Sequence, residues 1–181
     1  MIEGEKVRLR GFEKEDAEEL HEAMNNPDMI RFLSVYKPHS KEEEEEWIEK
    51  TWEERKKGEK YAFAIEEKEN GELIGSISLM DIEDNNKRAE IGAWIKQEYW
   101  GKGYGTEAEK LIIKYGFEEL NLHSIYGRVY EFNKRSQRAV EKTGFKKAGR
   151  FREAIYRHGE YHDAILYDIL KEEYMENKEE I

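Results

Sequence analysis

The chain has 181 residues, of which 40% are charged and 38% hydrophobic, and its formal net charge is −11. This length suits one domain with a sizeable core. The sequence holds no run of 18 apolar residues, and its start, MIEGEKVRLR, lacks the apolar core of a signal peptide. A membrane span and secretion are therefore not expected. Cysteine is absent, which excludes thiolate chemistry, and we expect a cytoplasmic protein.

The charge is unevenly distributed along the chain. Residues 101–160 contain 13 Lys and Arg against 8 Asp and Glu, whereas residues 1–100 contain 16 against 27. The overall acidity argues against a nucleic-acid-binding protein, which should be basic overall or on one face. A basic segment suits an anionic ligand and an acidic remainder suits a cationic one. Charged residues on solvated surfaces would give the same counts.

The first half of the chain predicts two helices and four strands. Residues 7–12 predict a strand, and apolar residues then recur at helical spacing until NNPD at 25–28 stops the helix. Ser40 and Glu43 form a capping-box pattern before a second helix, whose run Glu42–Glu46 is interpreted as a solvated helix start. Further strands are expected at 61–65, 72–80 and 88–95, the first two around the hairpin turn Asn70-Gly71.

The second half begins with a turn of three glycines, WGKGYGTEA at 100–108, and a helical pattern follows it. A strand is expected at 124–130, and Asn133 can cap a helix that runs to about Thr143. Residues 151–157 and 161–170 predict a last hairpin. We therefore predict one α+β domain over residues 1–174, in which an antiparallel meander leads into a strand–helix–strand unit. Residues 175–181 are expected to be a frayed acidic tail.

A strand, a glycine turn and a helix together indicate an anion site at a helix N-terminus. A Walker loop needs Lys-Ser/Thr after its last glycine, but Gly105 is followed by Thr106-Glu107. A dinucleotide fingerprint needs a third glycine that G-K-G-Y-G-T lacks. The pattern that fits is x-x-G-x-G, in which Gly103 and Gly105 let a pyrophosphate approach the backbone.

From Arg88 to Phe145 the chain resembles the GNAT superfamily of acyl-CoA-dependent N-acetyltransferases. The resemblance rests on AEIGAWIKQEYWGKGYGTEA and on NKRSQRAVEKTGF some thirty residues later. Its nearest branch is that of the ribosomal-protein N-terminal and spermidine acetyltransferases. The resemblance implies the GNAT fold, a mixed, mostly antiparallel twisted sheet whose central parallel strands splay and which helices flank. It also implies acetyl-CoA as cosubstrate and no metal.

The resemblance further implies where acetyl-CoA binds. Pantetheine would lie between the splayed strands, and the pyrophosphate would bind N–H groups of the turn. The cofactor-binding residues expected on this basis are Ile95, Lys96, Gln97, Lys102, Gly103, Tyr104, Gly105, Thr106, Asn133 and Ser136. One departure is Trp100, at a position where the superfamily often has Arg or Gln.

The expected reaction is attack of a primary amine on the thioester. An ammonium group with a pKa near ~10.4 must first lose a proton, so a base is needed. Glu90 is the first candidate, and an ion pair with Arg128 is an equally weighted alternative. The resemblance places the Ser136 hydroxyl near the sulfur. Val140 stands where many relatives have a proton-donating tyrosine, so that role is vacant or falls to Ser136. Glu90 and Ser136 are therefore the predicted catalytic residues.

The expected partner is a cationic amine: a polyamine, a protein N-terminus or a lysine. The resemblance places acceptors near Asp28, Arg31, Tyr36 and Trp47, although ordinary surface or core packing explains each of them more simply. His21 and His123 are expected to be structural, and Asp163 to make a structural hydrogen bond. The alternative function is a non-catalytic acyl-CoA-binding module of the same fold. A homodimer is compatible with the sequence.

Overall fold

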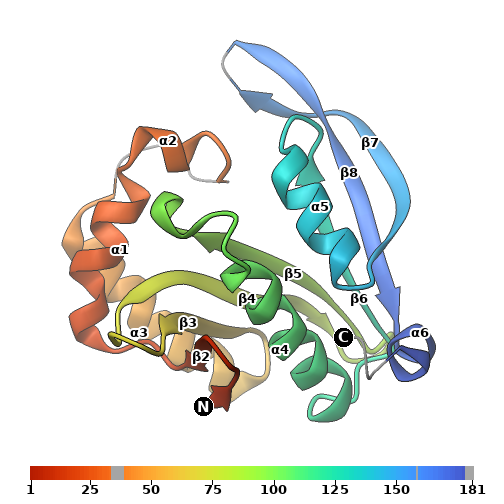
Figure 1. Cartoon of the computed structure of the whole chain (residues 1–181), viewed down its shortest axis with the longest axis horizontal. Coiled ribbons are helices and arrows are strands. Elements are labelled where there is room, and N and C mark those ends of the chain that lie inside the picture. Colours follow the sequence, from red (N-terminus) through yellow and green to blue (C-terminus); the bar gives the residue numbers. More distant parts are fainter. Residues whose placement is uncertain (34–38, 158, 178–181) are drawn as a thin grey trace.

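The computed structural model describes residues 1–33, 39–157 and 159–177. Within these residues, eight strands form one sheet in the order β1-β2-β3-β4-β5-β6-β8-β7 (Figure 1). The strands are β1 (Ile2–Glu3), β2 (Val7–Arg10), β3 (Tyr61–Glu67), β4 (Leu73–Glu83), β5 (Arg88–Ile95), β6 (Ser124–Tyr130), β7 (Lys146–Arg157) and β8 (Glu160–Leu170). The α-helices are α1 (Ala17–Met24), α2 (Pro27–Ile30), α3 (Lys41–Lys57), α4 (Tyr104–Glu118), α5 (Lys134–Lys142) and α6 (Lys171–Glu176).

Strand β3 explains why helices cover both faces of the sheet. Its side chains alternate between small and large, and a strand directs alternate side chains to opposite faces. Ala62 and Ala64 belong to a core cluster with residues of α1 and α3, whereas Phe63 and Ile65 belong to the main core, which includes α4. The sheet is thus the middle of three layers.

The sheet opens in its centre, between β5 and β6. Strands β5 and β6 lie wholly within the described residues. Their parallel pairing joins only Arg88–Glu90 to Ser124–Tyr126, whereas β5 pairs with β4 as far as Ile95. The predicted splay is therefore confirmed. The Lys96 N–H donates to the Ile74 carbonyl on the β4 side, at 2.8 Å. Because successive residues of a strand direct their backbone groups to opposite sides, those of Ile95 face the opening.

Local signals account for most of the element boundaries. The Asn133 side chain accepts a hydrogen bond from the Ser136 N–H (3.2 Å), and Ser40 and Glu43 form the predicted capping box. The sequence prediction missed β1 and α2 and began β7 five residues too late, at 151 instead of Lys146. NNPD does stop α1, but Asn26 also caps α2 and Pro27 occupies its first turn, so the same motif starts a second helix.

Helix α6 extends through Glu176 and so includes the first residues of the expected tail, while residues 178–181 lie outside the described part. In the described part of the chain, no helix is both long and apolar enough to cross a membrane.

Candidate active site

Two adjoining cavities lie where the sheet opens. The first, of about 410 Å³, is bounded by the glycine turn, β5 and α5, and we call it the turn cavity. The second, of about 370 Å³, is bounded by α1, α3, β4 and β5, and we call it the carboxylate cavity. The residues that line both cavities are Phe32, Leu33, Ala93, Trp94, Asn133 and Ser136. A ligand in one cavity can therefore reach a ligand in the other.

The glycine turn presents backbone to the turn cavity. Gly101 and Gly103 have φ values of 75° and 91°, in the left-handed region that favours glycine. Gly103 is the N-cap of α4, and the first N–H groups of a helix have no intrahelical acceptor. Gly103, Gly105 and Thr106 line the cavity, so these N–H groups and the positive end of the helix dipole meet it. This arrangement suits a phosphate group.

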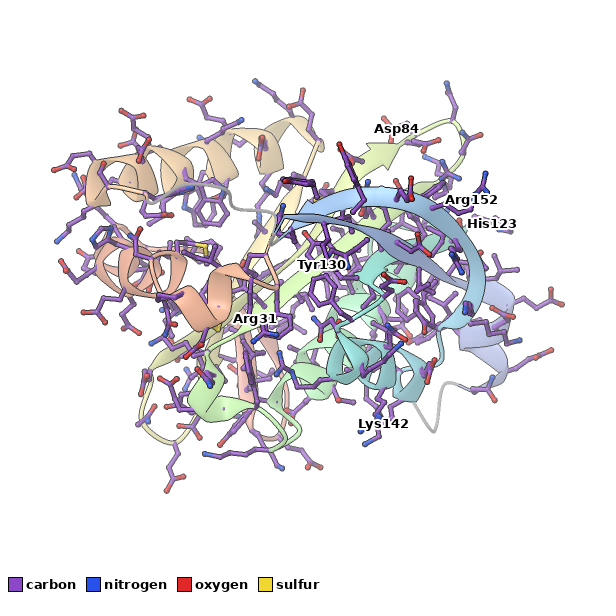
Figure 2. The ribbon with its side chains drawn as sticks, turned by 90° about the horizontal axis from the view of Figure 1, so that it is seen from above. Arg31, Asp84, His123, Tyr130, Lys142 and Arg152 are labelled. Atoms are coloured by element: carbon purple, nitrogen blue, oxygen red, sulfur yellow. The ribbon has the colours of Figure 1, made fainter. Side chains whose placement is uncertain are left out.

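Three cations of α5 line the same cavity. Arg135, Arg138 and Lys142 follow one another at helical spacing, so they share a face of the helix, and their side chains are exposed at the cavity rim. Figure 2 shows Lys142 at the end of α5. The net positive charge of this region is visible in the sequence, but these three residues were not predicted as site residues. The sequence signal that could have identified them is their i, i+3, i+7 spacing in the helix that follows Asn133.

The turn cavity also contains a buried carboxyl group. Glu109 of α4 accepts a hydrogen bond from the Thr143 hydroxyl (3.1 Å), and Thr143 is itself fully buried. Burial raises the pKa of Glu109 to about 7. The sequence analysis did not single out Glu109, because one glutamate in a helix that also carries Glu107 and Glu118 gives no signal.

In the carboxylate cavity, Glu90 is paired. Its two carboxylate oxygens accept hydrogen bonds from Arg128 Nε (2.8 Å) and Nη2 (2.9 Å). The Glu90 side chain is 9% exposed and that of Arg128 is 52% exposed. The ion pair expected as one alternative is therefore present. Glu90 nevertheless lines the cavity, so the pairing is compatible with contact to a ligand.

A second carboxylate in this cavity corrects the sequence analysis. Glu44 belongs to the run that was interpreted as solvated, but it is only 3% exposed and shares the buried face of α3 with Ile48 and Thr51. Its Oε1 lies 2.9 Å from Nδ1 of His39, and burial raises the pKa of Glu44. The spacing 44, 48, 51 could have shown which glutamate of the run faces inward.

The other expected cofactor-binding residues divide into two groups. Ile95, Asn133, Ser136, Gly103, Gly105 and Thr106 line the turn cavity. By contrast, the Lys96 side chain is held by Glu19 (2.7 Å) and Glu72 (3.1 Å), and its N–H is used by the sheet. Gln97 begins a 3-10 helix, and the Tyr104 hydroxyl donates to Glu67. Among the described residues that line the turn cavity, Lys102 and Tyr104 are not found, so a contribution of their backbone N–H groups to phosphate binding stays a prediction.

Trp100 has a defined role in the turn. Its indole N–H donates to the Ile95 carbonyl at 2.6 Å, so the tryptophan closes one end of the opening. Trp47 lines the carboxylate cavity, and Tyr36 lies outside the described residues. Asp163 accepts the Glu153 N–H (2.8 Å) and pairs with Arg150, which confirms its structural hydrogen bond.

Comparison with known proteins identifies the family. Residues 6–146 match the model of the acetyltransferase (GNAT) domain, and the chain belongs to this family of acetyl-CoA-dependent N-acetyltransferases. The spermidine N(1)-acetyltransferase of Escherichia coli K12 is 30% identical, over 93% of this chain and 88% of its own. The predicted family and fold are therefore confirmed.

Two solved structures extend the comparison. The spermidine N-acetyltransferase from Vibrio cholerae in complex with CoA and spermine superposes with a TM-score of 0.84, at 27% identity, over 94% of this chain and 98% of its own. The ribosomal-protein-S5-alanine acetyltransferase from Vibrio fischeri has a TM-score of 0.85 at 22% identity, over 93% of this chain and 95% of its own. This last likeness concerns the fold alone. Among the described residues, no group of three or more His, Asp or Glu is placed to hold a metal ion.

Proposed function

We propose that the acceptor of this acetyltransferase is a cationic primary amine that binds in the carboxylate cavity while acetyl-CoA occupies the turn cavity. The observation that carries the proposal is the junction of the two cavities at Ala93, Trp94 and Ser136. On one side lie backbone N–H groups and exposed cations, which suit the phosphates of CoA. On the other side lie Glu44 and Glu90, which suit an ammonium group. The relation to spermidine N-acetyltransferases supports the same division.

In the proposed reaction the amine attacks the thioester directly. The ammonium group gives one proton to Glu90, or to a water molecule that Glu90 holds, and the free amine nitrogen then bonds to the carbonyl carbon. The carbon–sulfur bond breaks, and the thiolate takes up a proton. The amide nitrogen has by then lost a second proton, so the net products are the acetylated amine, CoA thiol and one released proton.

Two features would stabilise this reaction. The Ile95 N–H faces the opening and could donate to the carbonyl oxygen as it gains negative charge. The Ser136 hydroxyl, at the first turn of α5, would donate to the leaving sulfur. Val140 has no hydroxyl, so the donor role that a tyrosine has in many relatives would fall to Ser136. The enzyme is proposed to act in the cytoplasm.

The test is a thiol-release assay with acetyl-CoA and a panel of amines: spermidine, a lysine-containing peptide, a peptide with a free basic N-terminus, and a neutral primary amine. Mass spectrometry of each product should show one added acetyl group. We expect spermidine or the basic peptides to be acetylated fastest. Tight CoA binding without thiol release for any amine would instead indicate a non-catalytic acyl-CoA-binding module.

A further inference from the structure

The segment Met29–Leu33 lies over the junction of the two cavities. Phe32 and Leu33 line both of them, and Met29 lines the turn cavity. Helix α2 (Pro27–Ile30), whose last two residues begin the segment, has only four residues. Because so short a helix is not stable by itself, its position depends on the tertiary contacts of the segment.

The first of these contacts is made by the Leu33 carbonyl. It accepts hydrogen bonds from Arg157 Nη2 (2.8 Å) and from the Tyr130 hydroxyl (3.3 Å). Figure 2 shows Tyr130 beside the β7–β8 hairpin. Among the described residues that line the turn cavity, neither Arg157 nor Tyr130 is found. The two donors of this contact therefore do not border the turn cavity, although Tyr130 lines the carboxylate cavity.

The second contact is made by the Phe32 ring, and it does involve the turn cavity. The Phe32 and Trp100 rings are 5.8 Å apart and nearly perpendicular. The Arg135 guanidinium carbon lies 3.2 Å from the Trp100 ring centroid and 5.2 Å from that of Phe32. Trp100 and Arg135 both line the turn cavity. Arg135 thus connects the glycine turn to the segment that covers both cavities.

Besides contacting Trp100 and Phe32, Arg135 carries a charge that suits it to bind a ligand. Within the described residues no carboxylate pairs with Arg135, and its side chain lies at the cavity rim. A guanidinium group can stack on an aromatic ring through its face and donate hydrogen bonds from its edge. Arg135 can therefore stay on Trp100 and bind a phosphate group at the same time.

We propose that Arg135, stacked on Trp100, is a positioning residue through which CoA in the turn cavity orders the segment Met29–Leu33 and so shapes the carboxylate cavity for the amine. This inference rests on the proposed function, because it takes CoA as the ligand of the turn cavity. It follows by linkage that CoA and the amine strengthen each other's binding. It also gives a role to the aromatic residue at position 100.

The experiment is hydrogen–deuterium exchange on the full chain, with and without saturating CoA, with CoA affinity measured by calorimetry. Arg135→Met keeps the side-chain length but removes the charge and the planar group. Trp100→Gln removes the ring but keeps a side-chain N–H for the Ile95 carbonyl. Lys134→Met removes the neighbouring exposed cation of α5 and is the matched control. The amides to compare are those of residues 28–33 and those of residues 104–107.

In the wild type and in Lys134→Met, CoA should slow hydrogen exchange in both regions. In residues 28–33 the exchange rate should fall by roughly fivefold, which corresponds to the lower end of the coupling free energies usual between two sites. In Arg135→Met and Trp100→Gln, CoA should still slow hydrogen exchange in residues 104–107 but leave the exchange rate of residues 28–33 unchanged. Equal slowing of residues 28–33 in all four proteins would overturn the role of Arg135, as would no slowing there in the wild type. Absence of CoA binding to the wild type would refute the proposed function itself, and this inference with it.

Discussion

The turn cavity takes its charge from backbone N–H groups and from exposed cations of α5, whereas the carboxylate cavity takes its charge from glutamates buried on α3 and β5. The difference in burial matters as much as the difference in sign. Exposed charges are screened by water and salt, so each contributes little, whereas a buried charge is strong and costly to disturb. We therefore expect the turn cavity to depend mainly on backbone shape and the carboxylate cavity on single side chains.

The largest effect is expected where backbone shape is altered. Gly103→Glu places a side chain at the N-cap of α4, where φ is 91°, and the cavity then loses close access to the helix N-terminus. Calorimetry should detect no CoA binding to a variant that is still folded. Gly71→Glu is the control, because Gly71 has a similar φ of 76° in a hairpin turn and is not among the described residues that line either cavity. Wild-type CoA affinity in Gly103→Glu would contradict the assignment of the turn cavity.

The next effect is expected from the buried glutamate of β5. Glu90→Gln keeps the shape of the side chain and removes the base, so kcat should fall by roughly 100-fold, within the range that general bases contribute. The matched control is Glu83→Gln, which breaks an exposed ion pair with Arg88 on the same sheet. If Glu90→Gln keeps its full rate but loses thermal stability, Glu90 has only the structural role with Arg128.

A third prediction concerns the buried carboxyl of Glu109 in the turn cavity, and it is a pH effect on stability. Glu109 has a pKa of about 7 in the folded protein against 4.5 as the reference value. Its ionisation therefore opposes folding, and the loss in free energy of unfolding that it causes grows as pH rises from about 4.5 to 7. Glu109→Gln should be more stable than the wild type by up to about 3 kcal/mol at pH 8 and no more stable at pH 4.

Denaturant unfolding of both proteins across this pH range measures the difference. Glu119→Gln, an exposed change at the end of the same helix, is the matched control. A stability gain for Glu109→Gln that is constant with pH would mean that Glu109 does not titrate in this range.

The smallest effect is expected from the exposed cations. Arg138→Gln should weaken CoA binding by roughly fivefold at low salt, because an exposed charge contact contributes up to about 1 kcal/mol. The loss should shrink as salt rises, since the screening length falls to roughly 8 Å near physiological ionic strength. Lys134→Gln, which removes an exposed cation outside the cavity, should leave affinity unchanged in the same titration. Equal losses in the two variants would show that only the net charge of α5 matters.

Much of the fold could be predicted from local patterns. The glycine turn, the Asn133 cap and the Ser40 capping box are decided within four or five residues, and each occurs where it was predicted. The start of β7 was missed because Lys146–Arg150 is an exposed edge of the sheet, without the apolar alternation that indicates a strand. Helix α2 was missed because a stop signal was not also considered as a start signal.

The site was predictable where backbone forms it and less so where side chains converge on it. The residues of the turn were found because glycine spacing reports backbone shape. Glu44, Arg135 and Glu109 were missed because their importance depends on which elements pack together, and the sequence alone did not place α3 against the opening or α5 beside α4. The pairing of Glu90 with Arg128 was anticipated, because β5 and β6 were expected to be neighbours.

If the two cavities separate two substrates by charge, the enzyme must prefer a cationic acceptor to a neutral one, and the ratio of their catalytic efficiencies measures this preference. The kcat/KM for spermidine should be divided by that for a neutral primary amine of similar length, with acetyl-CoA saturating, over a series of salt concentrations. We expect a ratio well above one at low salt that declines in part as salt rises, because salt screens the long-range attraction of the amine but screens the buried glutamates much less. A neutral amine that is the equal or better substrate at low salt would show that the charge of the carboxylate cavity does not select the acceptor.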